Sequence, residues 1–290
     1  MKNQIKTLFL LGILSAVLIS IGGALGPGYL YGFTILALLM NLGAYFFSDR
    51  IVLTMHGAQE VSPEQAPALH RMVEELARRA GIPKPRVCTM PGMQPNAFAT
   101  GRNPQHGVVA VTEGILRLLD ERELRGVLAH EIAHIKNRDI LVSTIAAAIA
   151  AAVSYLANAL SFATLFGGSQ EQEEEGEGSA ASGLLMVFVA PFLAMLIQLG
   201  ISRAREYLAD ETGAEISGDP EALARALEKL ERGAEVIPAA VPQPATASLF
   251  IVNPLSGGSR LLALLSTHPP MDERIRRLRA LRPRWQRVAA

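Results

Sequence analysis

Cysteine and charge are what this sequence has least of. Cys88 is the only cysteine among 290 residues, so no disulfide can form within the chain, which fits a reducing compartment. Without a second thiol nearby, Cys88 is expected to be a small core residue and not a nucleophile. Charged residues make up 19% of the chain, whereas a soluble domain has about a quarter. Basic and acidic residues balance at 27 each, so the net charge does not indicate a nucleic-acid partner.

The missing charge is concentrated near the N-terminus. No charged residue occurs between Lys6 and Asp49, and Gly26-Pro27-Gly28 divides this run into two apolar pieces. Each piece is long enough to cross a hydrocarbon core of about 30 Å as a helix, with the Gly-Pro-Gly turn at a membrane surface. Residues 1–48 are therefore predicted to form a transmembrane hairpin of two spans. The alternative is a cleaved signal peptide, but a second apolar run follows almost at once, which favours an uncleaved anchor.

Two further uncharged runs, Ile140–Gln170 and Gly178–Ser202, predict a second transmembrane hairpin over residues 140–201. Between them lies the acidic sequence EQEEEGEG, which predicts a solvated extracytoplasmic loop at residues 169–178. Its consecutive glutamates lack the alternation of a calcium-binding loop. The first of the two runs is rich in alanine, so a buried helix of a soluble domain is the alternative there.

The lysines and arginines next to the four predicted spans all lie at span ends on the same side of the membrane. Lys2 and Lys6 precede the first span, Arg50 follows the second, and two arginines follow the fourth. Because cytoplasmic loops carry the excess of these residues, both termini and the globular segments 49–139 and 202–290 are predicted to face the cytoplasm. The chain is thus expected to be a multi-pass protein whose folded part lies beside the lipid bilayer.

The globular segments are predicted to be α+β and mainly helical. Ser62-Pro63-Glu64-Gln65 is a capping sequence before a helix with an apolar face, and Gly81 ends that helix. Asp120 and Glu123 predict a second capped helix. The expected strands are Arg86–Met90, Ala97–Thr100 (at a sheet edge) and Gly107–Val111. The other expected helices are Glu113–Leu119, Glu121–Lys136, Ser202–Ile216, Glu221–Gly233 and Asp272–Leu281.

The sequence HEIAH within the predicted helix Glu121–Lys136 has the spacing of a zinc site. His130 and His134 are four residues apart, so both imidazoles lie on one helix face and can bind the same metal ion. Glu131 beside them can reach a water molecule at that ion and act as a general base. The neighbouring residues are apolar, and isolated histidines beside a carboxylate would be costly to bury without a metal. The pattern predicts a zinc metallopeptidase, against the alternative of surface histidines beside a solvated glutamate.

A catalytic zinc needs a third protein ligand, either a downstream histidine or a carboxylate. No histidine follows HEIAH at the spacing of a three-histidine site. Glu206 in SRAREYLAD is the better candidate, because it begins a helix where the chain returns to the cytoplasmic surface. Asp210 lies one turn later on the same face, where it can accept the free ring N–H of a ligating histidine. The alternative is that these residues are juxtamembrane charges in ordinary salt bridges.

Three blocks of the sequence, HEIAHIKNRD, SRAREYLAD and STHPPMDERIRRL, occur in the order found in the HtpX family of membrane-bound zinc endopeptidases. NAFATG and LFIVNPLSG also resemble that family, and the resemblance covers the whole chain. It implies a gluzincin-like zinc metallopeptidase domain fused to four transmembrane helices. It also implies one bound Zn²⁺ per chain.

The resemblance further implies roles for individual residues. The metal ligands would be His130, His134 and Glu206, with Glu131 as the general base and Asp210 behind a ligating histidine. His268 in THPP would stabilise the tetrahedral intermediate, although on its own it passes equally as a turn residue before two prolines. A strand formed by Asn96, Ala97, Phe98, Ala99 and Thr100 would pair with the substrate backbone, with Asn96 holding the peptide. Arg138 and Asp139 are interpreted as interface or packing residues.

The function implied by the resemblance is hydrolysis of peptide bonds in unfolded or damaged membrane proteins under stress, at the cytoplasmic face of the inner (plasma) membrane. Prenylated CAAX peptides are an alternative substrate class, because the CAAX prenyl endopeptidases are relatives. Four short spans are few to enclose the large intramembrane chamber of those enzymes. Another alternative is a non-catalytic membrane scaffold with a structural metal, against which an intact Glu131 argues. Nothing in the sequence indicates the oligomeric state.

Overall fold

The computed structural model describes residues 26–149, 203–236, 251 and 269–286, with parts of the stretch from Phe9 to Gly23. Within these residues the protein is mainly helical and has one four-stranded sheet, which agrees with the predicted α+β class. Three predicted features lie outside the described residues: His268, the acidic loop at 169–178, and most of the second transmembrane hairpin.

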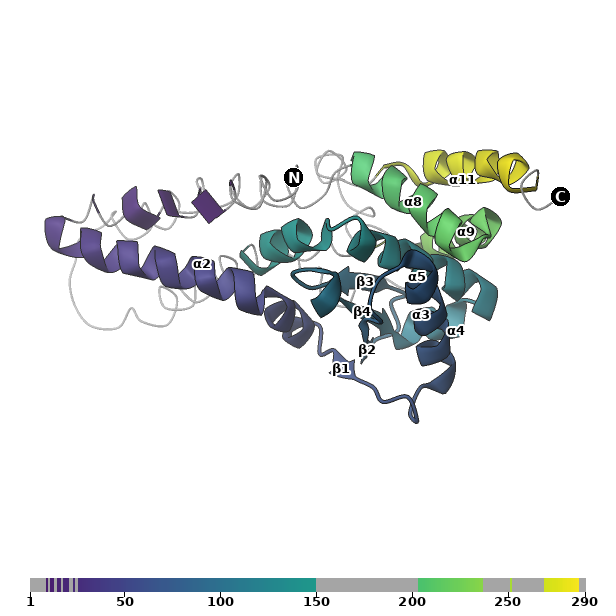
Figure 1. Ribbon diagram of the computed structural model, residues 1–290, viewed down its shortest axis with the longest axis horizontal. Helices are drawn as coiled ribbons and strands as arrows, with labels where there is room; N and C mark the ends of the chain where they lie inside the picture. The colour runs from purple at the N-terminus through teal and green to yellow at the C-terminus, as the bar shows by residue number, and fades with distance from the viewer. Residues whose placement is uncertain are drawn as a thin grey trace, which may run out of the picture.

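Helix α2, Pro27–Met55, projects away from the rest of the protein (Figure 1). Gly26 precedes it with a φ of 123°, and Pro27 occupies the first turn, where a missing N–H leaves no bond unmade. Large apolar side chains cover its surface, with Tyr31 76% and Leu38 60% exposed. Among the described residues, it is the one helix long and apolar enough to cross a membrane.

The same helix continues past the predicted domain boundary at residue 48. Asp49 stays helical and pairs with Arg86 of the sheet at 3.4 Å. Arg50 lies over the ring of Phe47, 5.6 Å from its centroid. Because both charges find partners without unwinding the helix, α2 runs directly into the globular part.

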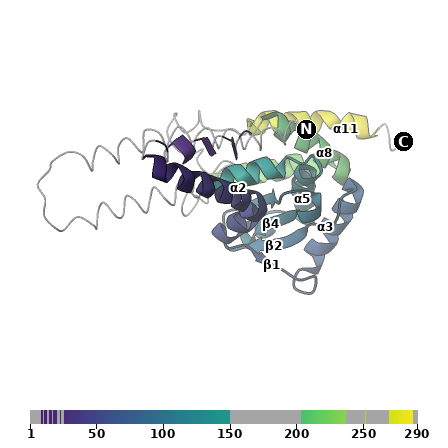
Figure 2. The ribbon, with the colours of Figure 1, turned by 60° about the vertical axis from the view of Figure 1, so that its left-hand side comes forward.

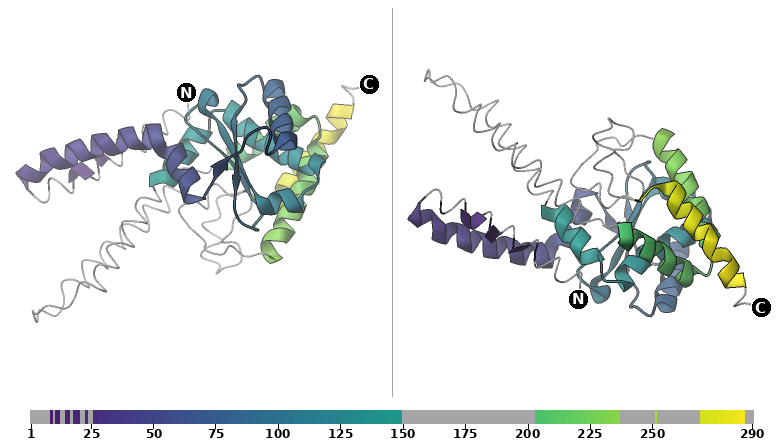
Figure 3. Two further views of the ribbon diagram at one scale, coloured as in Figure 1. Left: turned by 90° about the horizontal axis from the view of Figure 1, so that it is seen from below. Right: turned by 90° about the horizontal axis from the view of Figure 1, so that it is seen from above.

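Helical residues near the N-terminus lie beside α2, as a hairpin about Gly26 requires (Figure 3). Asn41 of α2 donates a hydrogen bond from Nδ2 to Ser15 Oγ at 2.7 Å. Leu11 and Leu18 pack against the same apolar cluster as the inner face of α2. These contacts join the described residues before Gly26 to α2, while the transmembrane hairpin stays a prediction.

The sheet has the strand order β1-β2-β4-β3. Its strands are β1 Gln59–Glu60, β2 Arg86–Met90, β3 Ala97–Thr100 and β4 Val108–Thr112, with the short helix η1, Pro104–His106, between the last two. β2 and β4 are parallel, whereas β1 pairs with β2 and β3 pairs with β4 in the antiparallel direction. β3 is therefore an edge strand, as predicted.

Both faces of the sheet are covered. One face, with Val87 and Val109, packs against α3 and α5 in the main core. The other face, with Cys88 and Phe98, packs against the end of α2 and the helix Ile140–Ile149. Figure 2 shows α3 and the end of α2 on opposite sides of the strands. The sheet thus separates the part of the protein that joins α2 from the part that holds α5.

Helix α3, Pro67–Ala80, begins later than its capping sequence predicts. Ser62 N donates to Gln65 Oε1 at 2.8 Å, but this pair closes the turn that precedes the helix. Pro67 then begins the helix itself, because proline suits a first turn. Gly81 ends the helix in the left-handed conformation with a φ of 72°, as predicted.

The remaining labelled helices lie around α5 (Figures 1 and 3). Their bounds are α4 Glu113–Leu118, α5 Glu121–Lys136, α8 Arg203–Ser217, α9 Pro220–Val236 and α11 Met271–Gln286. Each begins within one residue of its predicted start. α9 approaches α5 closely at Gly126, where a β-carbon would lie 2.7 Å from Leu223 N. α5 is thereby enclosed between the sheet and the C-terminal helices.

Candidate metal centre

Helix α5 begins with a capping box that holds its first turn. The Asp120 side chain accepts a hydrogen bond from Glu123 N at 2.9 Å, and Asp120 N donates to Glu123 Oε2 at 3.0 Å. Lys229 of α9 also pairs with Glu123 at 2.6 Å. The helix carries His130 and His134 on one face, with His130 buried and His134 half-buried. A continuous, capped helix therefore sets the spacing of the two imidazoles.

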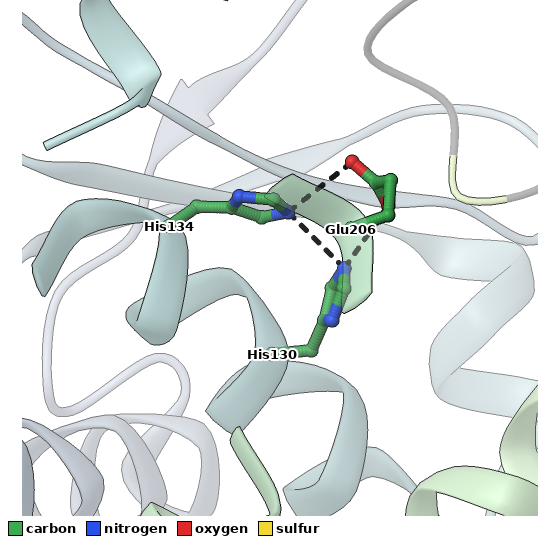
Figure 4. A group of neighbouring side chains, drawn as sticks. All are labelled: His130, His134 and Glu206. Carbon is green, nitrogen blue, oxygen red and sulfur yellow. Dashed lines mark hydrogen bonds and ion pairs between the residues drawn. The ribbon is translucent and has the colours of Figure 1, made fainter. Parts of the chain in front are cut away.

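Three side chains from two helices converge on one point, as Figure 4 shows. His130 Nε2 lies 3.2 Å from His134 Nε2, and each of these atoms lies 3.7 Å from an oxygen of Glu206 on α8. Tetrahedral zinc with bonds of about 2.0–2.1 Å holds neighbouring ligand atoms about 3.3 Å apart. The donor types and separations therefore fit such an ion. The helices bring together the three residues that the sequence predicted as ligands.

Asp210, one turn after Glu206 on α8, lies behind His130. Its Oδ1 is 3.0 Å from His130 Nδ1, at ion-pair distance but without the angle of a hydrogen bond. Asp210 in turn accepts two hydrogen bonds from Arg274, of 2.8 Å from Nε and 2.7 Å from Nη2. Arg274 is fully buried, and its Nη1 lies 3.8 Å from Glu206. This buried arginine places α11 directly behind the cluster.

Arg274 is a residue that the sequence reasoning did not single out. A signal for it exists, because it shares a helical stripe with Met271, Ile275 and Leu278, which pack against the core. A charged residue on an apolar stripe predicts a buried partner of opposite charge. The sequence offers several acidic residues as that partner, and only the packing of α11 against α8 selects Asp210.

Asp139 does more than the predicted packing. Its two carboxylate oxygens each lie 3.1 Å from His134 Nδ1, and the residue is 2% exposed. Arg138 has a φ of 56°, which reverses the chain after α5 and brings Asp139 back to the histidine. The interpretation as a packing residue was incomplete because the turn at Arg138 leaves no pattern in the sequence.

The nearby carboxylates govern the protonation of both histidines. Burial lowers the pKa of His134, but the charges of Asp139 and Glu206 outweigh it and raise that pKa to about 10. For His130, burial again lowers the pKa, while Asp210 and Glu206 raise it above the ordinary value. The cluster therefore has a strong affinity for positive charge at its centre.

Glu131 is buried beside the two histidines and contacts the sheet. Burial raises the pKa of its carboxyl group, while the histidines and a hydrogen bond from the backbone N–H of Ala99 act in the opposite direction. Ala99 belongs to β3. Glu131, which is not on the helix face of the two histidines, therefore directs its carboxyl group to the edge strand. Such a carboxyl can hold a proton near neutral pH more readily than an exposed one.

The hydrogen-bond pattern of β3 shows which backbone groups it leaves for another partner. Thr112 N donates to Asn96 O at 2.9 Å, and Phe98 lies opposite Ala110. Because hydrogen-bonded pairs alternate in an antiparallel ladder, Ala97 and Ala99 direct their backbone groups away from β4. The bond from Ala99 to Glu131 agrees with this direction.

Asn96 has a partner in the chain itself. Its Oδ1 accepts a hydrogen bond from Ile251 N at 3.1 Å, and the side chain is 2% exposed. The prediction had Asn96 hold the substrate peptide, whereas in this structure its side-chain oxygen holds a backbone N–H of LFIVNPLSG. In this structure the side-chain amide of Asn96 therefore binds a backbone group of the chain itself.

The chain is similar to known proteins over most of its length. The model of the family described as peptidase family M48 matches residues 63–282. The chain is 54% identical to "Protease HtpX homolog" of Syntrophobacter fumaroxidans over 97% of this chain and all of that protein. It is 55% identical to the protein of the same name from Aquifex aeolicus, over 91% of this chain and 88% of that one.

A solved structure shares the fold. The crystal structure of S. mikatae Ste24p matches 96% of this chain with a TM-score of 0.50 and 19% sequence identity. The match spans 65% of the length of that longer protein.

Proposed function

The chain belongs to peptidase family M48 and is a metalloprotease, and from this premise we propose that it is a zinc-dependent endopeptidase of the membrane. The observation that carries the proposal is the convergence of His130, His134 and Glu206 within 4.8 Å of one another, beside a buried Glu131. A cluster of this kind without a general base would suit a structural metal. With Glu131 next to it, the cluster suits hydrolysis.

The proposed ligand atoms are the Nε2 atoms of His130 and His134 and the carboxylate of Glu206. The Nδ1 atom of each histidine lies at a carboxylate, and the two Nε2 atoms face each other and Glu206, with Arg274 Nη2 3.4 Å from His130 Nε2. Zinc bound there would lower the pKa of a water molecule towards about 7 and polarise a substrate carbonyl. Three protein ligands leave a fourth position open, which is typical of a catalytic site.

Glu131 is proposed as the general base. Its carboxylate takes a proton from the attacking water and returns it to the leaving amine when the peptide bond breaks. Burial raises the pKa of Glu131, which brings it nearer to the operating pH and lets the same group accept and return the proton. His268 is proposed to stabilise the developing oxyanion. Its neighbour Pro269 is buried, and α11 begins directly afterwards with Arg274 in the cluster, which supports this placement.

The substrate is proposed to bind along β3 as an added strand. Ala97 and Ala99 direct backbone groups to the side where Glu131 lies, so a peptide paired there would place a carbonyl near the base. Asn96 at the start of the strand, with Phe98 and Thr100 in the β4 ladder, holds the strand rigid. Backbone pairing of this kind accepts many sequences, which suits unfolded substrates.

The protein is proposed to be a multi-pass protein of the inner (plasma) membrane with both termini and the site in the cytoplasm. The exposed apolar surface of α2 and the arginines and lysines at the predicted span ends support this location. The proposed substrates are unfolded or damaged membrane proteins, which a site close to the bilayer would meet first. Their removal under stress is the proposed role.

An activity assay on the full-length protein in detergent tests the proposal. The zinc-loaded wild type is expected to cleave an unfolded protein in preference to a farnesylated CAAX peptide. Glu131→Gln, which keeps the shape of the side chain, is expected to bind zinc as the wild type does and to lose activity by about 10²–10⁴-fold. Cleavage by Glu131→Gln at the wild-type rate would show that the base is another group. Zinc binding without cleavage of any unfolded substrate would favour the scaffold.

A further inference from the structure

We propose that Asp139 is a positioning residue that holds the imidazole of His134 in the orientation needed to bind the metal. The inference rests on the proposed zinc site and adds a residue to it. It starts from the contact of both Asp139 oxygens with His134 Nδ1 at 3.1 Å. The carboxylate is 2% exposed, so water does not compete for it.

The turn after α5 builds this contact from residues next to one another. Asp139 N donates to the carbonyl oxygen of His134 at 3.3 Å, while the Asp139 carboxylate bonds the ring of the same residue. Asn137 ends the helix, and Arg138 reverses the chain with its φ of 56°. Asp139 therefore contacts His134 through both backbone and side chain, which leaves the ring little freedom to rotate.

The contact also selects the tautomer of His134. A carboxylate at Nδ1 accepts the ring N–H there, so the lone pair remains on Nε2. Nε2 is the atom that lies 3.2 Å from His130 Nε2 and 3.7 Å from Glu206. With Asp139 absent, the ring would lose the bond that keeps this nitrogen directed to the metal position.

Each histidine of the cluster thus has a carboxylate of its own, supplied in a different way. Asp210 reaches His130 from α8, and Arg274 of α11 fixes it. Asp139 reaches His134 from the turn that ends α5, and buried Arg205 of α8 interacts with it electrostatically. The contacts around His130 require three helices, α5, α8 and α11. The contacts around His134 are formed largely by α5 and the turn that ends it.

A structural alternative is that Asp139 only caps the helix Ile140–Ile149, which begins at the next residue. Serine caps a helix about as well as aspartate does, but its shorter side chain cannot reach His134. Asp139→Ser therefore keeps the cap and removes the contact with the ring. Asp139→Asn keeps the shape and removes the charge.

The test is the zinc affinity of the full-length protein in detergent, measured by competition with a chelator. Asp139→Ser is expected to weaken zinc binding by about 10–100-fold in protein that circular dichroism shows to be folded. Asp139→Asn is expected to weaken it by about 10-fold, because an amide does not favour the Nδ1–H tautomer as a carboxylate does. With cobalt in place of zinc, Asp139→Ser should change the visible absorption spectrum, since the ring orientation sets the ligand field.

Wild-type zinc affinity in folded Asp139→Ser would overturn the inference, as would a cobalt spectrum identical to that of the wild type. Should the serine variant fail to fold, wild-type affinity in Asp139→Asn would overturn it instead. Glu206→Ala separates this from a failure of the proposed function. If the zinc site is wrong, Glu206→Ala keeps wild-type affinity; if only the role of Asp139 is wrong, Glu206→Ala loses zinc and the Asp139 variants do not.

Discussion

Gly213 of α8 faces the backbone of His130 so closely that a β-carbon at residue 213 would lie 2.9 Å from His130 Cα. Gly213 follows Glu206 by seven residues and Asp210 by three, so the three lie on one face of α8. The missing side chain at Gly213 therefore lets the two helices approach, and it sets the distance from His130 to both carboxylates.

Gly213→Ala is expected to push α8 away from α5. Overpacking at such a contact lowers the free energy of unfolding by about 1–3 kcal/mol, and here it should also weaken zinc binding. The matched control is Gly233→Ala, where the β-carbon would meet the end of the flexible Leu118 side chain at 3.2 Å. Denaturant unfolding and chelator competition compare the two. Equal changes in unfolding free energy and zinc affinity in the two variants would show that the distance between α8 and α5 does not determine zinc binding.

Arg274→Ala should be among the most destabilising single changes in the protein. It leaves the buried carboxylate of Asp210 without its cation, which costs about 3–5 kcal/mol of unfolding free energy. Arg276→Ala is the control, because Arg276 is exposed and its pair with Glu273 contributes less than about 1 kcal/mol. A similarly small loss of unfolding free energy in both variants would show that the buried pair of Arg274 and Asp210 does not stabilise the fold.

The destabilisation by Arg274→Ala should depend on pH in a defined direction. Burial raises the pKa of Asp210, but Arg274 outweighs burial and holds that pKa below its usual range. A depressed carboxyl pKa stabilises the fold above the unfolded value of about 3.9, and the stabilisation is lost as the pH falls through the folded value. The difference in stability between wild type and variant should therefore be full at neutral pH and shrink below about pH 4. A difference that grew on acidification would contradict this.

Cys88 should not react in the folded protein. The residue is 2% exposed, and burial raises the pKa of its thiol to about 11. A maleimide at neutral pH is expected to label the protein after denaturation and not before. Met93→Cys provides a positive control, because Met93 is 45% exposed. Labelling of native Cys88 as fast as of Cys at residue 93 would contradict the burial.

Leu38→Arg tests whether α2 lies in lipid. Leu38 is 60% exposed near the middle of α2, and an arginine at the centre of a membrane helix costs about 2.5–3.5 kcal/mol of insertion free energy. The fraction of protein that stays with membranes after alkaline extraction should fall. Leu208→Arg, at a residue of α8 that is 49% exposed, should leave it unchanged. No loss with Leu38→Arg would indicate that this face of α2 contacts something other than lipid.

Much of the fold follows from patterns within short stretches of sequence. The capping box of Asp120 and Glu123 predicts where α5 begins, and the structure confirms it. Alternation and length predict Arg86–Met90 and Ala97–Thr100 as strands with their observed bounds. The start of α3 was misplaced because Ser62 and Gln65 form their bonds in a turn, and Pro67 has its own preference for a first turn.

Within the site, spacing by itself determined that His130 and His134 share a helix face and that Glu206 and Asp210 share another. Helical periodicity places residues three and four apart together wherever the helix goes, so no tertiary contact is needed for that inference. The tertiary structure decided which faces meet. Gly213 brings α8 onto α5.

Tertiary structure alone also supplied the supporting residues around the ligands. Arg274 reaches Asp210 across 64 residues, and the turn at Arg138 directs Asp139 to His134. An ion pair between distant helices depends on packing, and a left-handed turn at a residue other than glycine depends on the surroundings that hold it. Neither produces a period or a motif, so the sequence determined the chemistry at the centre while the packed fold decided what orients it.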